Sequence, residues 1–384
     1  MKLKQTVSTL ALTGMVVASS ATMVFADQTN IITIGENLTP QQKEEMLKFF
    51  NAPKGSYEEL SINNQEERDA LNGIAPLAQI GTKTLSCAYV QPASTGTGIN
   101  VKTANLTWVT AGMISNALVT AGMQDANVIA AAPFKVSGTG ALTGVMKAFE
   151  DATGKKLDPA KKKLANQELV VTGDIAANDK VGKDKAAAAV NEVKTQVIKN
   201  GTKDTNQIAD TINNVMNNYN INLSQKQEED LQDTMQGIAK EKYNYENMKG
   251  TLNKVGSNIK GTLENTEQAV KDSGFFQSIM SSIKNFFSSD KENKTEENTG
   301  ILNQTNNSAL GGDVQITDTD SNTQDTEADN APNSTPNDQS REDSSKDGIF
   351  ESIRRFFSNI FQSDNQDSKT NISTDDEDNN NGEN

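Results

Sequence analysis

The chain has 384 residues, with 36 Lys and Arg against 51 Asp and Glu, a single Cys and no His. The absence of His excludes Ser-His-Asp and Cys-His catalysis and zinc sites that use His, and we expect no cofactor and no metal site. Residues 290–384 hold 7 basic and 22 acidic residues, which is the whole excess of 15 negative charges, so no nucleic-acid partner is expected.

The first 26 residues have the pattern of an export signal. Two lysines precede an apolar stretch that ends in Val24-Phe25-Ala26, a small-x-small cleavage site, so residues 1–26 are predicted to be a signal peptide. The apolar run is shorter than the roughly 20 residues that a membrane span needs. We therefore expect a secreted protein, extracellular or associated with a cell envelope, and an exported chain without disulfides fits a Gram-positive envelope. Because a single Cys forms no intramolecular disulfide, Cys87 is expected to be a buried apolar residue.

Residues 27–175 are predicted to form a layered domain of the α/β (or α+β) class. The β-branched run Ile31–Ile34 predicts a strand, and Thr39 with Pro40 predicts the start of the helix that follows. A second helix is predicted between Asn64 as its cap and Gly73 as its end. Strands alternating with helices favour one sheet with helices packed on it.

The same domain continues with a predicted hairpin over residues 82–110, whose two strand-like runs flank Ser94-Thr95-Gly96-Thr97-Gly98. The nearly apolar segment 126–136 predicts a strand covered on both faces. Helices are predicted over residues 111–123 and 139–154, before and after this strand.

Residues 176–272 are predicted to be a helical extension of two or three helices that pack on the first domain. Apolar residues recur at helical spacing from Ile208 to Tyr219 and from Leu231 to Leu263, and Ser224 with Gln227 forms a capping box. A coiled-coil surface for a partner is the alternative. Frequent Gly residues in the second run favour packing on the domain.

The remaining residues predict an acidic tail that carries two copies of one amphipathic helix. Residues 290–346 are predicted to be a disordered acidic linker and residues 363–384 a disordered acidic tail, because their hydrophobicity is low and their negative charge high. Between them lie two predicted helices, residues 273–289 and 347–362, whose sequences GFFQSIMSSIKNFFSS and GIFESIRRFFSNIFQS align without a gap.

Each copy gathers its large apolar residues on one face at about 100° per residue. They are Phe275, Phe276, Ile279, Ile283, Phe286 and Phe287 in the first copy, and Ile349, Phe350, Ile353, Phe356, Phe357, Ile360 and Phe361 in the second. Such short helices need a surface to bury against. Four surfaces are open: the folded core, a membrane, a partner protein of the envelope, or the other copy. A membrane surface or an envelope protein is preferred.

One loop and five carboxylates are the candidate sites. Ser137, Gly138, Thr139 and Gly140 lie between a buried strand and a helix, where backbone N–H groups can bind an anion, although the glycines also suit a plain tight turn. A pair drawn from Asp125, Glu150, Asp151, Glu168 and Asp174 could hydrolyse wall glycans, but their spacing does not identify a pair. Trp108, the only Trp, is expected in the core rather than as a sugar platform.

Three segments resemble the domain of unknown function 1002 family of secreted Firmicute proteins. They are ITIGENLTPQQKEEMLKFF, the block from Asn105 to Lys155 and ANQELVVTG, and the resemblance covers about residues 30–270. It implies export but transfers no activity or catalytic residue. We therefore expect a non-catalytic extracellular or envelope binding protein of unknown ligand. The alternative is a carboxylate-dependent hydrolase of cell-wall glycans or peptides.

Overall fold

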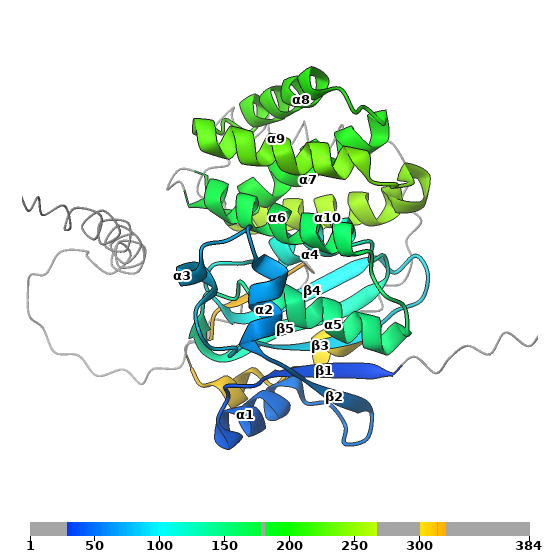
Figure 1. Ribbon diagram of the computed structural model, residues 1–384. Coiled ribbons are helices and arrows are strands. Elements are labelled where there is room, and N and C mark those ends of the chain that lie inside the picture. The colour runs from blue at the N-terminus through cyan, green and yellow to red at the C-terminus, as the bar shows by residue number, and fades with distance from the viewer. Residues whose placement is uncertain (1–28, 178–180, 267–299, 313, 320–384) are drawn as a thin grey trace, which may run out of the picture. The chain divides into compact units, whose positions relative to one another are not determined.

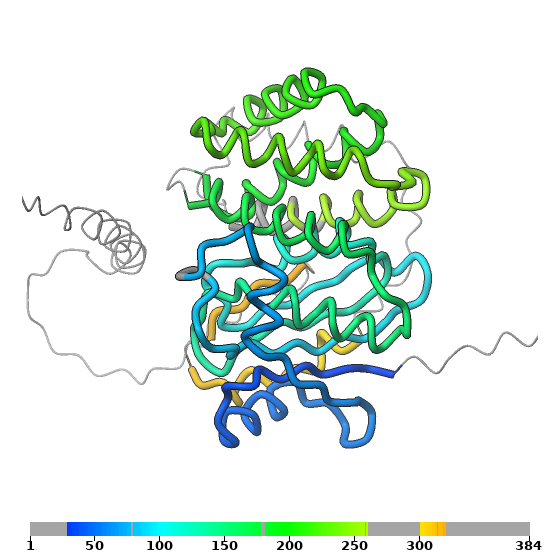
Figure 2. Tube along the Cα trace, in the orientation of Figure 1, coloured from blue at the N-terminus to red at the C-terminus, as the bar shows by residue number. Residues whose placement is uncertain are grey.

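The computed structural model describes residues 29–177, 181–266, 300–312 and 314–319. Within them a mixed sheet of six strands lies between helices (Figures 1 and 2). The order across the sheet is β2-β1-β3-β5-β4-β6. The strands are β1 (Asn30–Gly35), β2 (Tyr57–Ile62), β3 (Cys87–Pro92), β4 (Ile99–Leu106), β5 (Ala126–Val136) and β6 (Ile316–Asp318). The predicted α/β class and its layered arrangement are confirmed.

Strand direction decides where the loops of the sheet gather. β1 pairs in parallel with β2 and β4 with β5, while β3 is antiparallel to both β1 and β5. β1, β2, β4 and β5 therefore run in the same direction, and their carboxyl ends lie at the same edge. We call this the carboxyl edge of the sheet.

One face of the sheet is covered by α1 (Pro40–Phe50) and two short 3-10 helices, η1 (Gly300–Gln304) and η2 (Asn307–Leu310). α1 begins as predicted, because Thr39 and Gln42 form a capping box and Pro40 occupies the first turn. Met46, Phe49 and Phe50 of α1 are fully buried against this face.

The opposite face carries α4 (Ala111–Thr120) and α5 (Ala141–Thr153), beside α2 (Asn64–Leu71) and α3 (Leu77–Ile80). Further helices stack beyond them: α6 (Pro159–Ala176), α7 (Lys183–Asn200), α8 (Thr205–Asn218), α9 (Gln225–Lys240) and α10 (Tyr245–Thr266) (Figure 1). One hydrophobic cluster continues from the sheet through α4 and α5 into these helices. None of the described helices combines the length and apolar composition that a membrane span requires.

The helical layer also buries an ion pair. Lys194 Nζ lies 2.9 Å from Glu168 Oε1, and neither side chain is more than 1 % exposed. Lys194 also donates to the carbonyl of Asn116 at 2.8 Å, and Glu168 accepts a hydrogen bond from Thr120. Removing one partner would leave a buried charge uncompensated.

Four predictions about the chain's organisation are wrong. Residues 183–266 form four helices, α7 to α10, where two or three were predicted. β3 and β4 are not a hairpin, since β5, apolar on both faces, lies between them. α2 is capped by Asn63 rather than Asn64, because the Asn63 side chain accepts from the Glu66 N–H. Residues 300–312 and 314–319, which fall in the predicted disordered linker, form η1, η2 and β6. Ile301 and Leu302 explain this difference, since both are 1 % exposed in the sheet core.

Candidate functional site

The carboxyl edge gathers the polar loops of the sheet. Glu36 and Asn37 follow β1, and Asn63 follows β2 and caps α2. The loop Ser137–Gly140 joins β5 to α5. In open α/β sheets, ligands bind at this kind of edge, where loops leave the carboxyl ends of parallel strands.

The loop Ser137–Gly140, predicted as a possible anion site, forms a tight turn that packs against other side chains of the protein. Gly138 has φ +82°, and a Cβ there would lie 3.0 Å from side-chain atoms of Leu106 and Val109. A Cβ on Gly140 would overlap the carboxyl group of Glu67. Both glycines are therefore explained by close packing, and an added anion beside Gly140 would meet a carboxyl group of the protein itself.

Glu67 is an unusual group for a folded protein. It is 3 % exposed, and burial raises the pKa of its carboxyl to about 7. Thr84 and Asn64 lie beside the carboxyl and lower the pKa, while the charge of Glu66 raises it. Thr84 Oγ1 and Asn64 Nδ2 are buried without a hydrogen bond of ordinary geometry. The side chain thus changes charge near neutral pH in an incompletely paired polar cluster.

An open cavity of about 470 Å³ lies next to this cluster. Its lining residues are Glu36, Asn37, Asn63, Asn64, Gln65, Arg68 and Thr82. Every one of these side chains is polar, and Glu36 supplies the only carboxylate among them. Asn64 is shared with the surroundings of Glu67, so the buried carboxyl lies behind one wall of the cavity.

Hydrogen bonds within the wall decide what the cavity offers a ligand. Asn37 Oδ1 accepts from the Thr84 N–H at 2.8 Å, and Asn63 Oδ1 accepts from the Glu66 N–H at 3.0 Å. Asn64 Oδ1 accepts from Arg68 Nε at 2.6 Å. Arg68 Nη2 also donates to the Gly81 carbonyl at 2.9 Å, and Asn64 Nδ2 is buried. The groups left to donate to a ligand are therefore the amide nitrogens of Asn37 and Asn63 and the remaining N–H groups of the Arg68 guanidinium.

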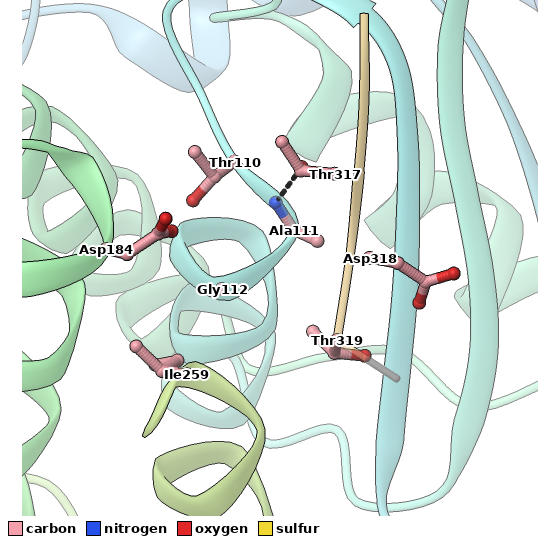
Figure 3. Close-up of a pocket in the computed structure, with 8 residues that line it drawn as sticks. All are labelled: Thr110, Ala111, Gly112, Asp184, Ile259, Thr317, Asp318 and Thr319. Atoms are coloured by element: carbon pink, nitrogen blue, oxygen red, sulfur yellow. Dashed lines mark hydrogen bonds between the residues drawn. The ribbon is translucent and has the colours of Figure 1, made fainter. Parts of the chain in front are cut away.

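A second cavity, of about 10 Å³, lies at the start of α4 (Figure 3). It is lined by Thr110, Ala111, Gly112, Asp184, Ile259, Thr317, Asp318 and Thr319. Burial raises the pKa of Asp184 there, partly offset by Lys183 and Thr110. This volume holds about one water molecule. The cavity is therefore too small for a substrate.

The five carboxylates considered for hydrolysis have separate surroundings, and none of them lines the larger cavity. Asp125 accepts from the N–H groups of Gly96 and Gly98 at 2.9 and 2.8 Å. Glu168 is held by Lys194, as described above. In the part of the chain that the structure describes, His, Cys, Asp and Glu form no group of three suited to a metal ion.

The other three carboxylates are Glu150, Asp174 and Asp151, and each has a structural contact or lies at the surface. Glu150 bridges Lys162 at 2.8 Å and Lys156 at 3.2 Å. Burial raises the pKa of Asp174 to about 6, with nearby Lys226 lowering it. Asp151 is exposed near the end of α5.

Cys87 is buried as the sequence predicts, whereas Trp108, predicted in the core, lies at the margin of the core. Cys87 is 2 % exposed, and burial raises the pKa of its thiol to about 12. Trp108 is half-buried and packs against Gly173 of α6, where a Cβ would overlap the indole. Neither residue belongs to the cavity. The two predicted docking helices, residues 273–289 and 347–362, lie outside the described residues.

Comparison with known proteins agrees with the resemblance seen in the sequence. The model of the family described as protein of unknown function (DUF1002) matches residues 34–255. The chain belongs to this family. It is 33% identical over 263 residues to the uncharacterized protein YpuA of Bacillus subtilis (strain 168), covering 67% of this chain and 89% of the relative. No solved structure matches. The family match contains the whole cavity wall and ends within α10.

The sequence predicts that Ser137–Gly140 joins a buried strand to a helix, as it does, but it gives no indication of Glu67, Asn37 or Arg68. The reason is that β2 was not predicted, since its burial pattern has one fully buried residue among six. Without β2, nothing in the sequence brings Asn63 and α2 beside the end of β1.

Proposed function

We propose that this protein is an exported, non-catalytic binding protein of the extracellular space or cell envelope, and that it holds an oxygen-rich ligand at the carboxyl edge. The observation that carries the proposal is the polar cavity beside Asn37, Asn63 and Arg68. Export is supported by the sequence of residues 1–26.

The donor groups of the cavity indicate the class of ligand. Amide nitrogens and a guanidinium pair with hydroxyl, ether and carbonyl oxygens, which are abundant in saccharides. Arg68 and Glu36 carry opposite charges, so the wall favours a ligand of little net charge. A cell-wall glycan fits both requirements.

Binding is favoured over hydrolysis by the arrangement of carboxylates. Glycoside hydrolysis ordinarily needs two carboxyl groups on opposite sides of the scissile bond. Glu36 is the only carboxylate that lines the cavity, and Glu67 lies behind Asn64. Hydrolysis is nevertheless the second candidate, because a carboxyl with a pKa of about 7 suits a general acid.

Titration of the mature protein with N-acetylglucosamine oligomers and soluble peptidoglycan fragments, followed by NMR, tests the proposal. We expect shifts centred on Asn37, Asn63 and Gln65, and at least ten-fold weaker binding for Arg68→Gln. The matched control is Lys226→Gln on the surface of α9, which should bind normally. No binding, or shifts confined to other parts of the chain, would reject the site. If the parent protein releases reducing ends from these glycans and Glu67→Gln does not, the function is hydrolysis rather than binding.

The repeated tail segments extend the proposal. The apolar faces of residues 273–289 and 347–362 would each bind a lipid surface weakly. Two linked sites bind more tightly than one. Sedimentation with liposomes of the mature protein and of a Phe350→Ser, Phe357→Ser, Phe361→Ser variant tests this part. Equal binding by parent and variant, or none by the parent, would reject a membrane role and favour an envelope protein as partner.

A further inference from the structure

A segment near the end of the described chain binds the rest of the protein as an extended ligand would. We call this segment, residues 300–312 and 314–319, the strap, and we call residues 29–177 and 181–266 the body. β6 of the strap pairs antiparallel with the outer edge of β4. The Asn105 N–H donates to the carbonyl of Gln315 at 2.8 Å, and the Thr319 N–H donates to the carbonyl of Val101 at 2.9 Å. Addition of a strand to an open sheet edge is a common way to recognise a peptide.

Thr317 gives this pairing a sequence requirement. Its Oγ1 accepts from the Ala111 N–H at the start of α4, at 2.8 Å, and lies 2.6 Å from Thr103 Oγ1 (Figure 3). A side-chain oxygen at this position satisfies one of the N–H groups that a helix leaves unpaired at its start. A strand without Ser or Thr here would leave that group without its partner.

Lys102 supplies a second requirement from the body. It is 7 % exposed in the sheet, and its Nζ donates to the carbonyl of Leu302 at 3.2 Å and to Thr305 Oγ1 at 2.7 Å. Both acceptors belong to the strap. Next to them, Ile301 and Leu302 are each 1 % exposed among residues of the sheet and α1. The surface of the body that binds the strap therefore combines a sheet edge, a buried cation and an apolar pocket. We call this surface the strap groove.

The segment that links α10 to the strap is long, so the strap in a groove can belong to the same chain or to another copy. Residues 267–299 join Thr266 at the end of α10 to Gly300, and a chain of this length reaches at most about 120 Å when extended. The strap also lies beyond the region that matches the family, which ends at residue 255. The groove thus belongs to the body, and the strap that binds in it is a segment tethered to the body by residues 267–299.

We propose that the strap is exchangeable and that the strap groove also receives the strap of a second copy of this chain, giving a strand-exchanged dimer. The same contacts serve both arrangements, so the balance depends on concentration. A tethered ligand has an effective concentration of about millimolar. The monomer is therefore favoured in dilute solution, and exchange is favoured where copies are crowded at a surface.

Two full-length variants separate the two halves of this interaction. Ile301→Asp with Leu302→Asp disables the strap and keeps the groove. Lys102→Glu disables the groove, because a carboxylate then faces the carbonyl of Leu302 and the charge of Asp318, and keeps the strap. In sedimentation equilibrium each variant alone should show the mass of one chain, and their equimolar mixture should show a 1:1 dimer. A mixture that keeps the one-chain mass, with both variants folded by circular dichroism, overturns the proposal.

Hydrogen exchange gives a second readout with milder substitutions, Ile301→Ala for the strap and Lys102→Met for the groove. The Asn105 amide should exchange quickly in the strap-defective variant alone, and at least ten-fold more slowly after the groove-defective variant is added. A copy that carries both sets of substitutions is the control and should give no protection. Equal exchange rates with the groove-defective copy and with the control would also overturn the proposal.

Discussion

Replacing Glu67 with Gln should remove a pH-dependent loss of stability that the native protein carries. The pKa of this carboxyl is 4.5 in an unfolded chain and about 7 in the folded protein, because the side chain is 3 % exposed. Below pH 4.5 both states are protonated and stability is complete. As the pH rises to 7 the unfolded state releases its proton first, so stability falls. At 1.36 kcal/mol per pH unit the loss is about 3 kcal/mol. The nearby start of α5 favours the charged form, which makes this an upper limit.

The assay is urea unfolding of the parent and of Glu67→Gln at pH 4.5 and at pH 8. The variant should gain up to about 3 kcal/mol over the parent between these two pH values, since Gln does not ionise. Other titrating groups are common to both proteins and cancel in the difference. Glu58→Gln, at an exposed position of β2, is the matched control for the substitution. A difference between parent and Glu67→Gln that stays constant within about 0.5 kcal/mol would mean that folding does not change the pKa of Glu67, and would refute the raised value.

Three other tests examine the packing: a pair of glycine substitutions, the buried ion pair and the reactivity of Cys87. Gly173→Ala should cost about 1–3 kcal/mol in urea unfolding, because its methyl would overlap the indole, whereas Gly250→Ala, with open space in α10, should gain up to about 1 kcal/mol. Lys194→Met should cost about 3–5 kcal/mol, and adding Glu168→Gln should recover much of this loss; no recovery would contradict the buried ion pair. The Cys87 thiol should react with a disulfide reagent only as the chain unfolds, so rapid labelling in native buffer would contradict its burial.

The local structure was predictable where the signal lies within a few residues. Thr39 and Ser224 begin helices because their side chains accept from N–H groups three residues away, and Pro40 suits the first helical position. The apolar run of β5 indicated a strand buried on both faces, and the burial of its first eight residues agrees. None of the residues that line the larger cavity was predicted as a site; the glycines between β5 and α5 only lie beside it, with Gly140 against Glu67.

The choice of neighbours across the sheet was not predictable in the same way. The runs that form β3 and β4 predict strands, but alternation indicates which face is buried and not which strand lies alongside. β5 pairs with both, and this order follows from packing over the whole domain. Likewise, nothing near Gly140 in the sequence indicates that the carboxyl of Glu67 lies against it.

The sequence by itself therefore determined the family, the helix caps, the burial of Cys87 and the α/β class, since each depends on local spacing or on similarity of residues. The tertiary structure decided the place of β5 between β3 and β4, the polar cavity beside α2 and the binding of the strap along β4. Each of these brings together residues that are distant in the chain, and their energies depend on burial and pairing that exist only after the sheet has assembled.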